Sequence, residues 1–175
     1  MAQSPSLDQQ IRVDLGPRSY DIFVGSDTLA QLGGACRDAC QARRVVVISD
    51  TTVADLYAEP ALASLRGAGL DAQLLTVNPG EASKTLAVVA SLYDRLFELA
   101  VERSDAVLAL GGGVVGDLAG FVAATFKRGL DFIQAPTTLL AMVDSSIGAK
   151  LNDRPASPCP PILVRSDWIS STIGK

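Results

Sequence analysis

Short apolar segments alternate with amphipathic ones along the chain, a pattern that predicts strands and helices in turn. Uniformly apolar runs at 45–48 and 106–110 predict buried strands, because a strand with one wet face would alternate in polarity. Further strands are expected over 70–77 and 132–135. The clearest amphipathic helix is expected over 86–101, with one apolar stripe made of Val89, Leu92, Leu96 and Leu99.

The N-terminal part of the pattern differs, because two short segments alternate strictly between apolar and polar residues. These are Ile11 to Leu15 and Tyr20 to Val24, with Gly16-Pro17 between them, which predicts a β-hairpin. Further helices are expected from Ser26 to about 33, over 51–65 despite Pro60, from the glycines at 111–113 to about 126, and over 137–143.

The alternation of elements predicts a mostly parallel sheet with helices on both faces. Ligands bind such sheets at the carboxyl ends of the strands. Four polar or glycine-rich segments follow predicted strands, and we expect them along one edge: Asp50, Gly80-Glu81, Gly111 to Gly113 and Thr137-Thr138.

The segment Gly111-Gly112-Gly113 is the strongest sign of a binding site. A strand that breaks into glycines before a helix brings backbone N–H groups up to a phosphate. Glycine suits this role because a Cβ would block the approach and because the turn can require a positive φ. The spacing is not the usual dinucleotide fingerprint, so a plain tight turn stays open as an alternative.

The polar residues near these glycines each have a structural and a functional interpretation. Asp117 either complements the helix dipole or accepts a hydrogen bond from a sugar hydroxyl. Glu81 and Lys84 form a solvated ion pair or hold a ribose or phosphate. Thr137-Thr138 can cap a helix, and Lys127-Arg128 can end one or bind a phosphorylated substrate. The segment 144–150 is either a surface loop or an active-site loop.

Composition narrows the function classes. With 175 residues, 48% hydrophobic and 19% charged, the chain suits one globular domain. Its net charge of −4 offers no basic surface for nucleic acid or a membrane. We find no signal peptide, and the longest apolar stretch, 106–116, is too short to span a bilayer, so a soluble, cytoplasmic protein is expected.

Histidine is absent and there are three cysteines. Without histidine, neither a Ser-His-Asp triad nor a histidine-containing zinc site can form within the chain. The odd number of cysteines argues against a disulfide framework. Cys36 and Cys40, four residues apart in an expected helix, are best interpreted as small buried residues, since two thiols alone would not hold a metal.

Read together, the motifs resemble the 3-dehydroquinate synthase family. The match runs from the first hairpin to Lys150 and is most specific from Gly111 onward. The shared motifs are Pro79-Gly80-Glu81-x-x-Lys84, Gly111 to Phe121, Phe126-x-Arg128-Gly129, Phe132 to Gln134, Pro136 to Leu140, and Val143 to Gly148 followed by Lys150.

The resemblance implies a Rossmann-like domain over 1–150 that binds NAD, joined in the family to a helical domain that binds a divalent metal, Zn or Co. It implies an enzyme of the shikimate pathway of aromatic amino acid (chorismate) biosynthesis, a carbon–oxygen lyase acting on phosphate. A small seven-carbon phosphorylated sugar acid is cyclised to 3-dehydroquinate with loss of phosphate. In the family the protein is usually a homodimer.

The resemblance also implies roles for individual residues. Cofactor contacts fall on ten positions: Asp50 and Thr52 at the adenosine ribose, Gly112, Gly113 and Val114 at the pyrophosphate, Asp117 near the nicotinamide, and Glu81, Lys84, Thr137 and Thr138 elsewhere on the cofactor. Substrate contacts fall on Asp144, Lys150 and Arg128, the last reaching the substrate phosphate of a neighbouring subunit. The family more often has asparagine at position 52.

The motifs stop after Lys150. The family usually has glycine in place of Ala149, and Leu151 begins an unrelated, proline-rich segment over 151–175, expected to be a frameshift or truncation product. The family's metal ligands, one glutamate and two histidines, lie in the absent helical second domain, so no metal ligand is assigned here. We expect a fragment inactive alone; the alternatives are another sugar-phosphate cyclase or a non-catalytic NAD-binding module.

Overall fold

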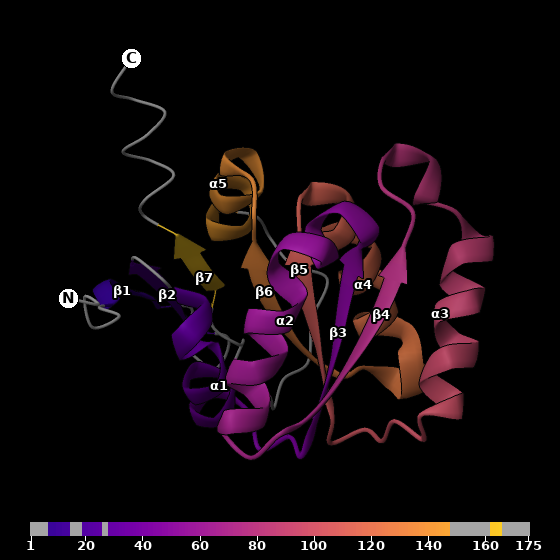
Figure 1. The fold of residues 1–175 in the computed structure, drawn as a ribbon, viewed down its shortest axis with the longest axis horizontal. Helices are drawn as coiled ribbons and strands as arrows, with labels where there is room; N and C mark the ends of the chain where they lie inside the picture. The colour runs from indigo at the N-terminus through magenta and orange to yellow at the C-terminus, as the bar shows by residue number, and fades with distance from the viewer. Residues whose placement is uncertain (1–6, 15–18, 26–27, 148–161, 166–175) are drawn as a thin grey trace.

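The protein is described by a computed structural model over residues 7–14, 19–25, 28–147 and 162–165. A seven-stranded sheet, in the order β1-β2-β7-β6-β5-β3-β4, runs through the middle (Figure 1). Only β1 and β2 pair antiparallel among the described strands. The strands are β1 (Leu7–Val13), β2 (Tyr20–Gly25), β3 (Arg44–Asp50), β4 (Asp71–Val77), β5 (Ala106–Gly111), β6 (Asp131–Pro136) and β7 (Ile162–Arg165).

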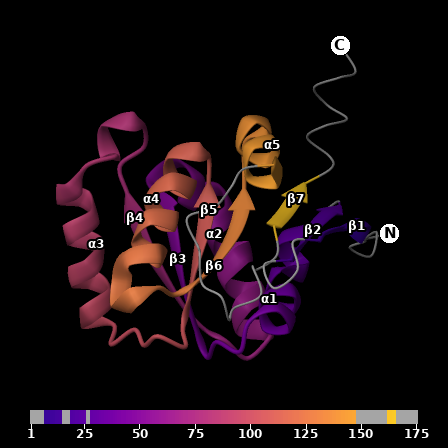
Figure 2. The same cartoon turned by 180° about the vertical axis from the view of Figure 1, so that it is seen from behind.

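Helices cover both faces of the sheet (Figures 1 and 2). Those described are α1 (Thr28–Ala39), α2 (Thr51–Gly67), α3 (Leu86–Glu98), α4 (Gly113–Thr125) and α5 (Leu139–Ile147), with short 3-10 turns η2 (Glu81–Ser83) and η3 (Phe126–Arg128). One apolar cluster joins α1 and α2 to the sheet, and a second joins α3 and α4 to the other face. The predicted parallel sheet, covered on both sides, is confirmed.

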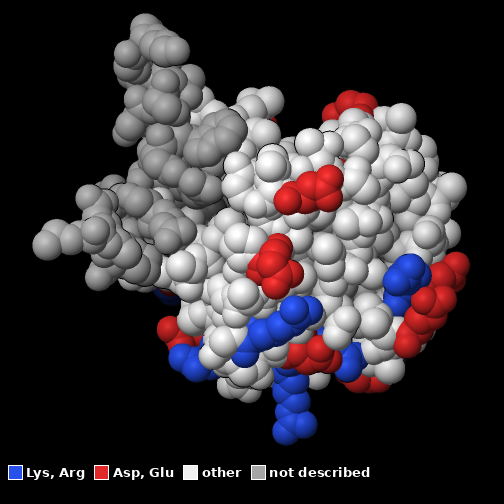
Figure 3. All heavy atoms as spheres, in the orientation of Figure 1, with Lys and Arg blue, Asp and Glu red and all other residues white. Residues whose placement is uncertain are grey.

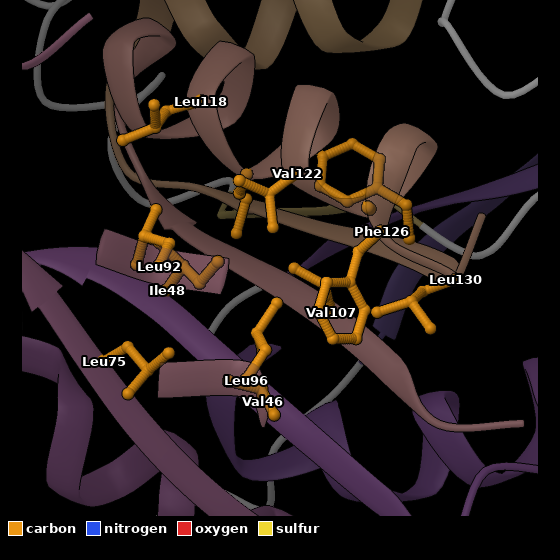
Figure 4. Packing of buried hydrophobic residues seen from close by; sticks show 14 of the residues in the cluster. Val46, Ile48, Leu75, Leu92, Leu96, Val107, Leu118, Val122, Phe126 and Leu130 are labelled. Carbon is orange, nitrogen blue, oxygen red and sulfur yellow. The ribbon is translucent and has the colours of Figure 1, made fainter. Parts of the chain in front are cut away.

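The central strands are buried throughout, as their uniform apolar sequences predict. Every residue of β5 is buried, and so are the five inner residues of β3. Side chains of α4, among them Leu118 and Val122, point from above toward Val107 of β5 and Leu96 of α3 (Figure 4). This packing fixes the axis of α4 relative to β5, and therefore fixes the turn between them.

Several element ends differ from those predicted. The first helix begins at Thr28 and continues to Ala39, well past 33; Ser26 lies outside the described residues. Helix α3 ends at Glu98, because Ala100 takes a φ of 50° and Val101 N–H closes the end by bonding to the Leu96 carbonyl. The segment 151–175 contains an unpredicted strand, β7, which lies between β2 and β6.

Acidic and basic side chains interleave over the α1 and α2 face seen in Figure 3, without a continuous basic area there. Within the described part of the chain, no helix is both long and apolar enough to cross a bilayer.

Candidate functional site

The carboxyl ends of the parallel strands bring the sequence motifs together along one edge. Strand β3 pairs with β5, and β5 with β6, so Asp50, the glycine turn and Thr137 follow adjacent strands. The Thr137 N–H donates to the Gly111 carbonyl at 3.0 Å, which ties the turn after β6 to the glycine turn. The expectation that these segments share one edge is confirmed.

At Gly111 and Gly112 a side chain would come close to neighbouring atoms, and at Gly113 the space in front of the backbone is open. The expectation of a positive φ in this turn is wrong. None of these glycines has a positive φ; the described glycines that do are Gly69, Gly80 and Gly129. A Cβ on Gly111 would lie 2.8 Å from the Cβ of Val115, and one on Gly112 would lie 3.4 Å from Thr138 Cγ2. A Cβ on Gly113 would meet nothing within 4 Å, so the turn leaves open space in front of Gly113.

Helix α4 begins at this turn without a side-chain cap. Gly112 occupies the N-cap position and offers no side chain to the first helical N–H groups. The Gly116 N–H donates to the Gly112 carbonyl at 3.0 Å. The N–H groups of residues 113–115 come too early in the helix to have a carbonyl partner within it. These donors and the positive end of the helix dipole suit an anion.

A lysine joins two of the candidate segments. The Lys84 ammonium lies 2.9 Å from Asp117 Oδ2 on α4 and 3.1 Å from Glu81 Oε2 in η2. The hydrogen bonds that the ammonium donates to Asp117, and then to Glu81, raise the pKa of Lys84 above its usual range. The bridge connects the segments that follow β4 and β5, the two neighbours of β3, and Asp50 is the last residue of β3.

The loop that carries Glu81 is held by a residue that the sequence analysis missed. Ser83 is buried, and its hydroxyl donates to the Asn78 carbonyl at 2.6 Å, bending the chain after Gly80, whose φ is 93°. The available signal was the small polar residue between Glu81 and Lys84, since a serine in a turn commonly bonds nearby backbone.

Asp50 and Thr138 cap helices, whereas the hydroxyl of Thr137 has no hydrogen-bond partner among the described residues. Asp50 caps α2, accepting from the Val53 N–H at 2.9 Å through Oδ1. Thr138 caps α5, accepting from the Ala141 N–H at 3.2 Å, as its structural interpretation predicts. Thr137 Oγ1 is buried with no hydrogen-bond partner, which is costly unless a ligand supplies one. Thr52 is exposed at the start of α2.

Arg128 lies far from these residues. It follows the carboxyl end of α4, whereas the glycine turn precedes the helix, and 13 residues of helix span about 20 Å. Asp144 is exposed on α5, and Lys150 lies outside the described residues. The structure therefore groups the expected cofactor residues at one edge and separates Arg128 from them.

The two described cysteines are packing residues. Cys36 in α1 and Cys40 just after it are buried, and the Cys40 thiol donates to the Cys36 carbonyl. Burial raises the pKa of both thiols, which keeps them protonated. Among the described residues no three His, Cys, Asp or Glu side chains are grouped to hold a metal, and the sequence has no histidine, so the residues present do not fit a divalent metal centre.

A glycine turn between a parallel strand and a helix, at the edge where the strands end, defines a Rossmann-like α/β domain. Residues 74–153 match the model of the 3-dehydroquinate synthase N-terminal family. The chain is 49% identical to the 3-dehydroquinate synthase of Pelotomaculum thermopropionicum over 143 residues, and 50% identical to that of Caulobacter vibrioides over 141. Over its N-terminal portion, the chain is homologous to the N-terminal domain of 3-dehydroquinate synthases.

These alignments cover 82% and 80% of this chain but only 38% of each relative. Among solved structures, a 2-deoxy-scyllo-inosose synthase complexed with carbaglucose-6-phosphate, NAD+ and Co2+ has a TM-score of 0.76 at 26% identity, covering 94% of this chain and 48% of that one. A 2-epi-5-epi-valiolone synthase from Streptomyces hygroscopicus with NAD+ and Zn2+ bound has a TM-score of 0.70 at 31% identity, covering 91% and 46%.

Proposed function

We propose that residues 1–150 form an NAD-binding domain and that the cofactor lies along the carboxyl edge of β3, β5 and β6. The observation that carries the proposal is the bare amino end of α4, with open space in front of Gly113. A pyrophosphate bound there would accept hydrogen bonds from backbone N–H groups near Gly112, Gly113 and Val114. The NAD+ in two similar structures supports this proposal.

The side chains of this edge offer hydrogen bonds suited to the rest of a dinucleotide. Asp50 uses Oδ1 for its cap, which leaves Oδ2 to accept from a ribose hydroxyl, with Thr52 beside it. The Thr137 hydroxyl is buried and would gain a partner. Thr138, as a cap, would contribute contact through its methyl group, which already lies close to Gly112.

Lys84, Glu81 and Asp117 form the charged side of the proposed site. The lysine is shared between two carboxylates, so it fixes both of them before a ligand arrives. Asp117, near the amino end of α4, is then held where it can accept a hydrogen bond from the nicotinamide half. When bound, NAD would supply reversible hydride transfer at a substrate hydroxyl.

We further propose that the whole protein is a 3-dehydroquinate synthase, which cyclises a seven-carbon phosphorylated sugar acid with loss of phosphate. The identity of about one half to curated 3-dehydroquinate synthases favours this over other sugar-phosphate cyclases, which match at 26% and 31%. Asp144 and Lys150 are the proposed substrate residues on this chain. We propose a cytoplasmic enzyme, which cell fractionation tests.

Arg128 has a different proposed role, because its own glycine turn is about one helix length away. An arginine at that position can meet a substrate phosphate only at another site, and we propose that this site belongs to a second copy of the chain in a homodimer. Size-exclusion chromatography with light scattering tests the dimer.

The decisive experiment is calorimetry of the purified chain with NAD. We expect one site per chain, and Thr137→Val should weaken binding while Thr52→Val, at an exposed position, should change it less. Absence of binding by a folded chain would refute the proposed site.

Because no metal ligand set is present among the described residues, we expect no phosphate release from the sugar-acid substrate by this chain alone.

A further inference from the structure

Backbone strain is concentrated at the edge of the sheet opposite the glycine turn. The non-glycine residues with positive φ in the described part of the chain are Ala100 at 50°, Lys127 at 45° and Arg128 at 66°. They lie in two loops, 99–105 and 126–130, which are joined by an ion pair between Lys127 Nζ and Glu102 Oε1 at 3.2 Å. Two consecutive left-handed residues with side chains are unusual, and such strain tends to collect at functional sites.

The strained turn is anchored on both sides. Phe126 is 3% exposed and packs against Phe97 and Tyr93, with ring centroids 4.9 and 5.8 Å apart. Leu130 is fully buried, and its N–H donates to the Ala123 carbonyl at 2.7 Å. These anchors hold the chain on each side of Lys127 and Arg128, so both basic residues project from a backbone that cannot relax toward the helical region.

Glu102 is itself held in place. Its N–H donates to Asp105 Oδ2 at 2.8 Å, and the Asp105 N–H donates back to the Glu102 carbonyl at 3.0 Å. Asp105 is 6% exposed and anchors the turn, whereas the Glu102 side chain is 69% exposed. The ion pair therefore connects Lys127 to a residue whose backbone is held by two hydrogen bonds.

The two neighbouring cations differ in what they contact. Lys127 is paired with Glu102, and its ammonium lies 6.0 Å from the Phe126 ring centroid. Arg128 is exposed, and none of the described carboxylates forms an ion pair with it. As far as the described residues go, the turn therefore presents the Arg128 guanidinium without an ion pair, and its planar donors suit a phosphate oxyanion.

We propose that Glu102 and Lys127 are positioning residues for Arg128: their ion pair sets the direction in which the strained turn presents the guanidinium to a phosphate group. The proposal rests on the proposed phosphate-binding role of Arg128. It is independent of NAD binding, which takes place at the other end of α4.

The test is an NMR titration of the ¹⁵N-labelled chain with inorganic phosphate, following the side-chain Nε–H and backbone N–H signals of Arg128. The informative variant is K127M/E102Q, because it removes the pair without changing the local net charge. K127R and the swap E102K/K127E retain a pair. Arg95→Gln/Glu98→Gln removes a comparable exposed pair on α3, with Nε and Oε2 3.2 Å apart, and serves as the matched control.

We expect K127M/E102Q to weaken phosphate binding at Arg128 about threefold to fivefold, while its melting temperature stays close to that of the parent chain. K127R, the swap and the α3 control should bind like the parent. Unchanged affinity in K127M/E102Q, weakened affinity in K127R, or no response of the Arg128 signals in the parent would each overturn the proposal. A normal NAD titration alongside would show that only this proposal had failed.

Discussion

The two ends of α4 differ in how the chain meets the helix. At the amino end the backbone takes ordinary conformations; a Cβ would come close to neighbouring atoms at Gly111 and Gly112, and the space in front of Gly113 is open. At the carboxyl end three consecutive residues, Lys127 to Gly129, have positive φ, and only the last is glycine. One end exposes unstrained backbone; the other holds side chains on strained backbone.

The difference follows from what each end presents. Backbone N–H groups at a helix start already point along the axis, so the fold needs only to keep side chains away from them. A long, flexible arginine has no such fixed direction and must be aimed by its own backbone. In the two proposed sites, strain at Lys127 and Arg128 and openness at Gly113 are thus different ways to prepare binding, and substitutions at Lys127 and Gly113 test them.

The largest expected effect is on stability at the amino end. Gly111→Ala places a Cβ 2.8 Å from the Cβ of buried Val115, and overpacking of this kind costs about 1–3 kcal/mol. Urea denaturation of the parent and variant measures the loss. Gly34→Ala on α1, where a Cβ meets nothing within 4 Å, is the control and should not destabilise. Equal stability of both variants would show that Gly111 is not packed as described.

The next effect is on binding at the same turn. Gly113→Ala meets no atom and replaces glycine with a better helix former, so the free energy of unfolding should be unchanged or slightly higher. Its methyl group would occupy the space proposed for the pyrophosphate, and we expect NAD affinity to fall about tenfold or more, equivalent to about 1.4 kcal/mol. Calorimetry measures this loss of NAD affinity, with Gly34→Ala as the control. Parent-like affinity would contradict the proposed position of the cofactor.

The amino end of α4 was predictable from sequence and the carboxyl end was not. Strand periodicity and the rule that parallel strands end at one edge were sufficient to bring Asp50, the glycine turn and Thr137 together. No local pattern marks Lys127 and Arg128 as left-handed, because that conformation is imposed by Phe126 and Leu130, which are buried against other elements. Tertiary packing also explains why β7 was missed, since its pairing with β2 and β6 is nonlocal.

A smaller effect is expected from relieving strain at the carboxyl end. Lys127→Gly and Lys127→Ala both remove the ion pair to Glu102, but only glycine accepts a φ of 45° without a steric penalty. We expect the glycine variant to be more stable than the alanine variant by about 1 kcal/mol. Thermal denaturation of the two proteins measures this difference directly. If alanine were equally stable, the turn would carry no strain at that residue.

The smallest effect concerns the charged contacts of the amino end, and it disappears at high pH. Asp117 and Glu81 raise the pKa of Lys84 in the folded state, so the folded chain holds this proton more tightly than the unfolded chain. The resulting stabilisation is complete below the unfolded pKa of about 10.4 and is lost as pH rises through the higher folded value. Because the ion pairs of Lys84 are exposed, this stabilisation should amount to less than about 1 kcal/mol.

Lys84→Met should therefore be less stable than the parent at pH 8, and the difference in stability should close by pH 12. Lys127→Met, which breaks the ion pair between η3 and Glu102, shows whether the closing gap is specific to Lys84. A gap that stayed constant across this range would mean that the Lys84 ammonium gains nothing from Asp117.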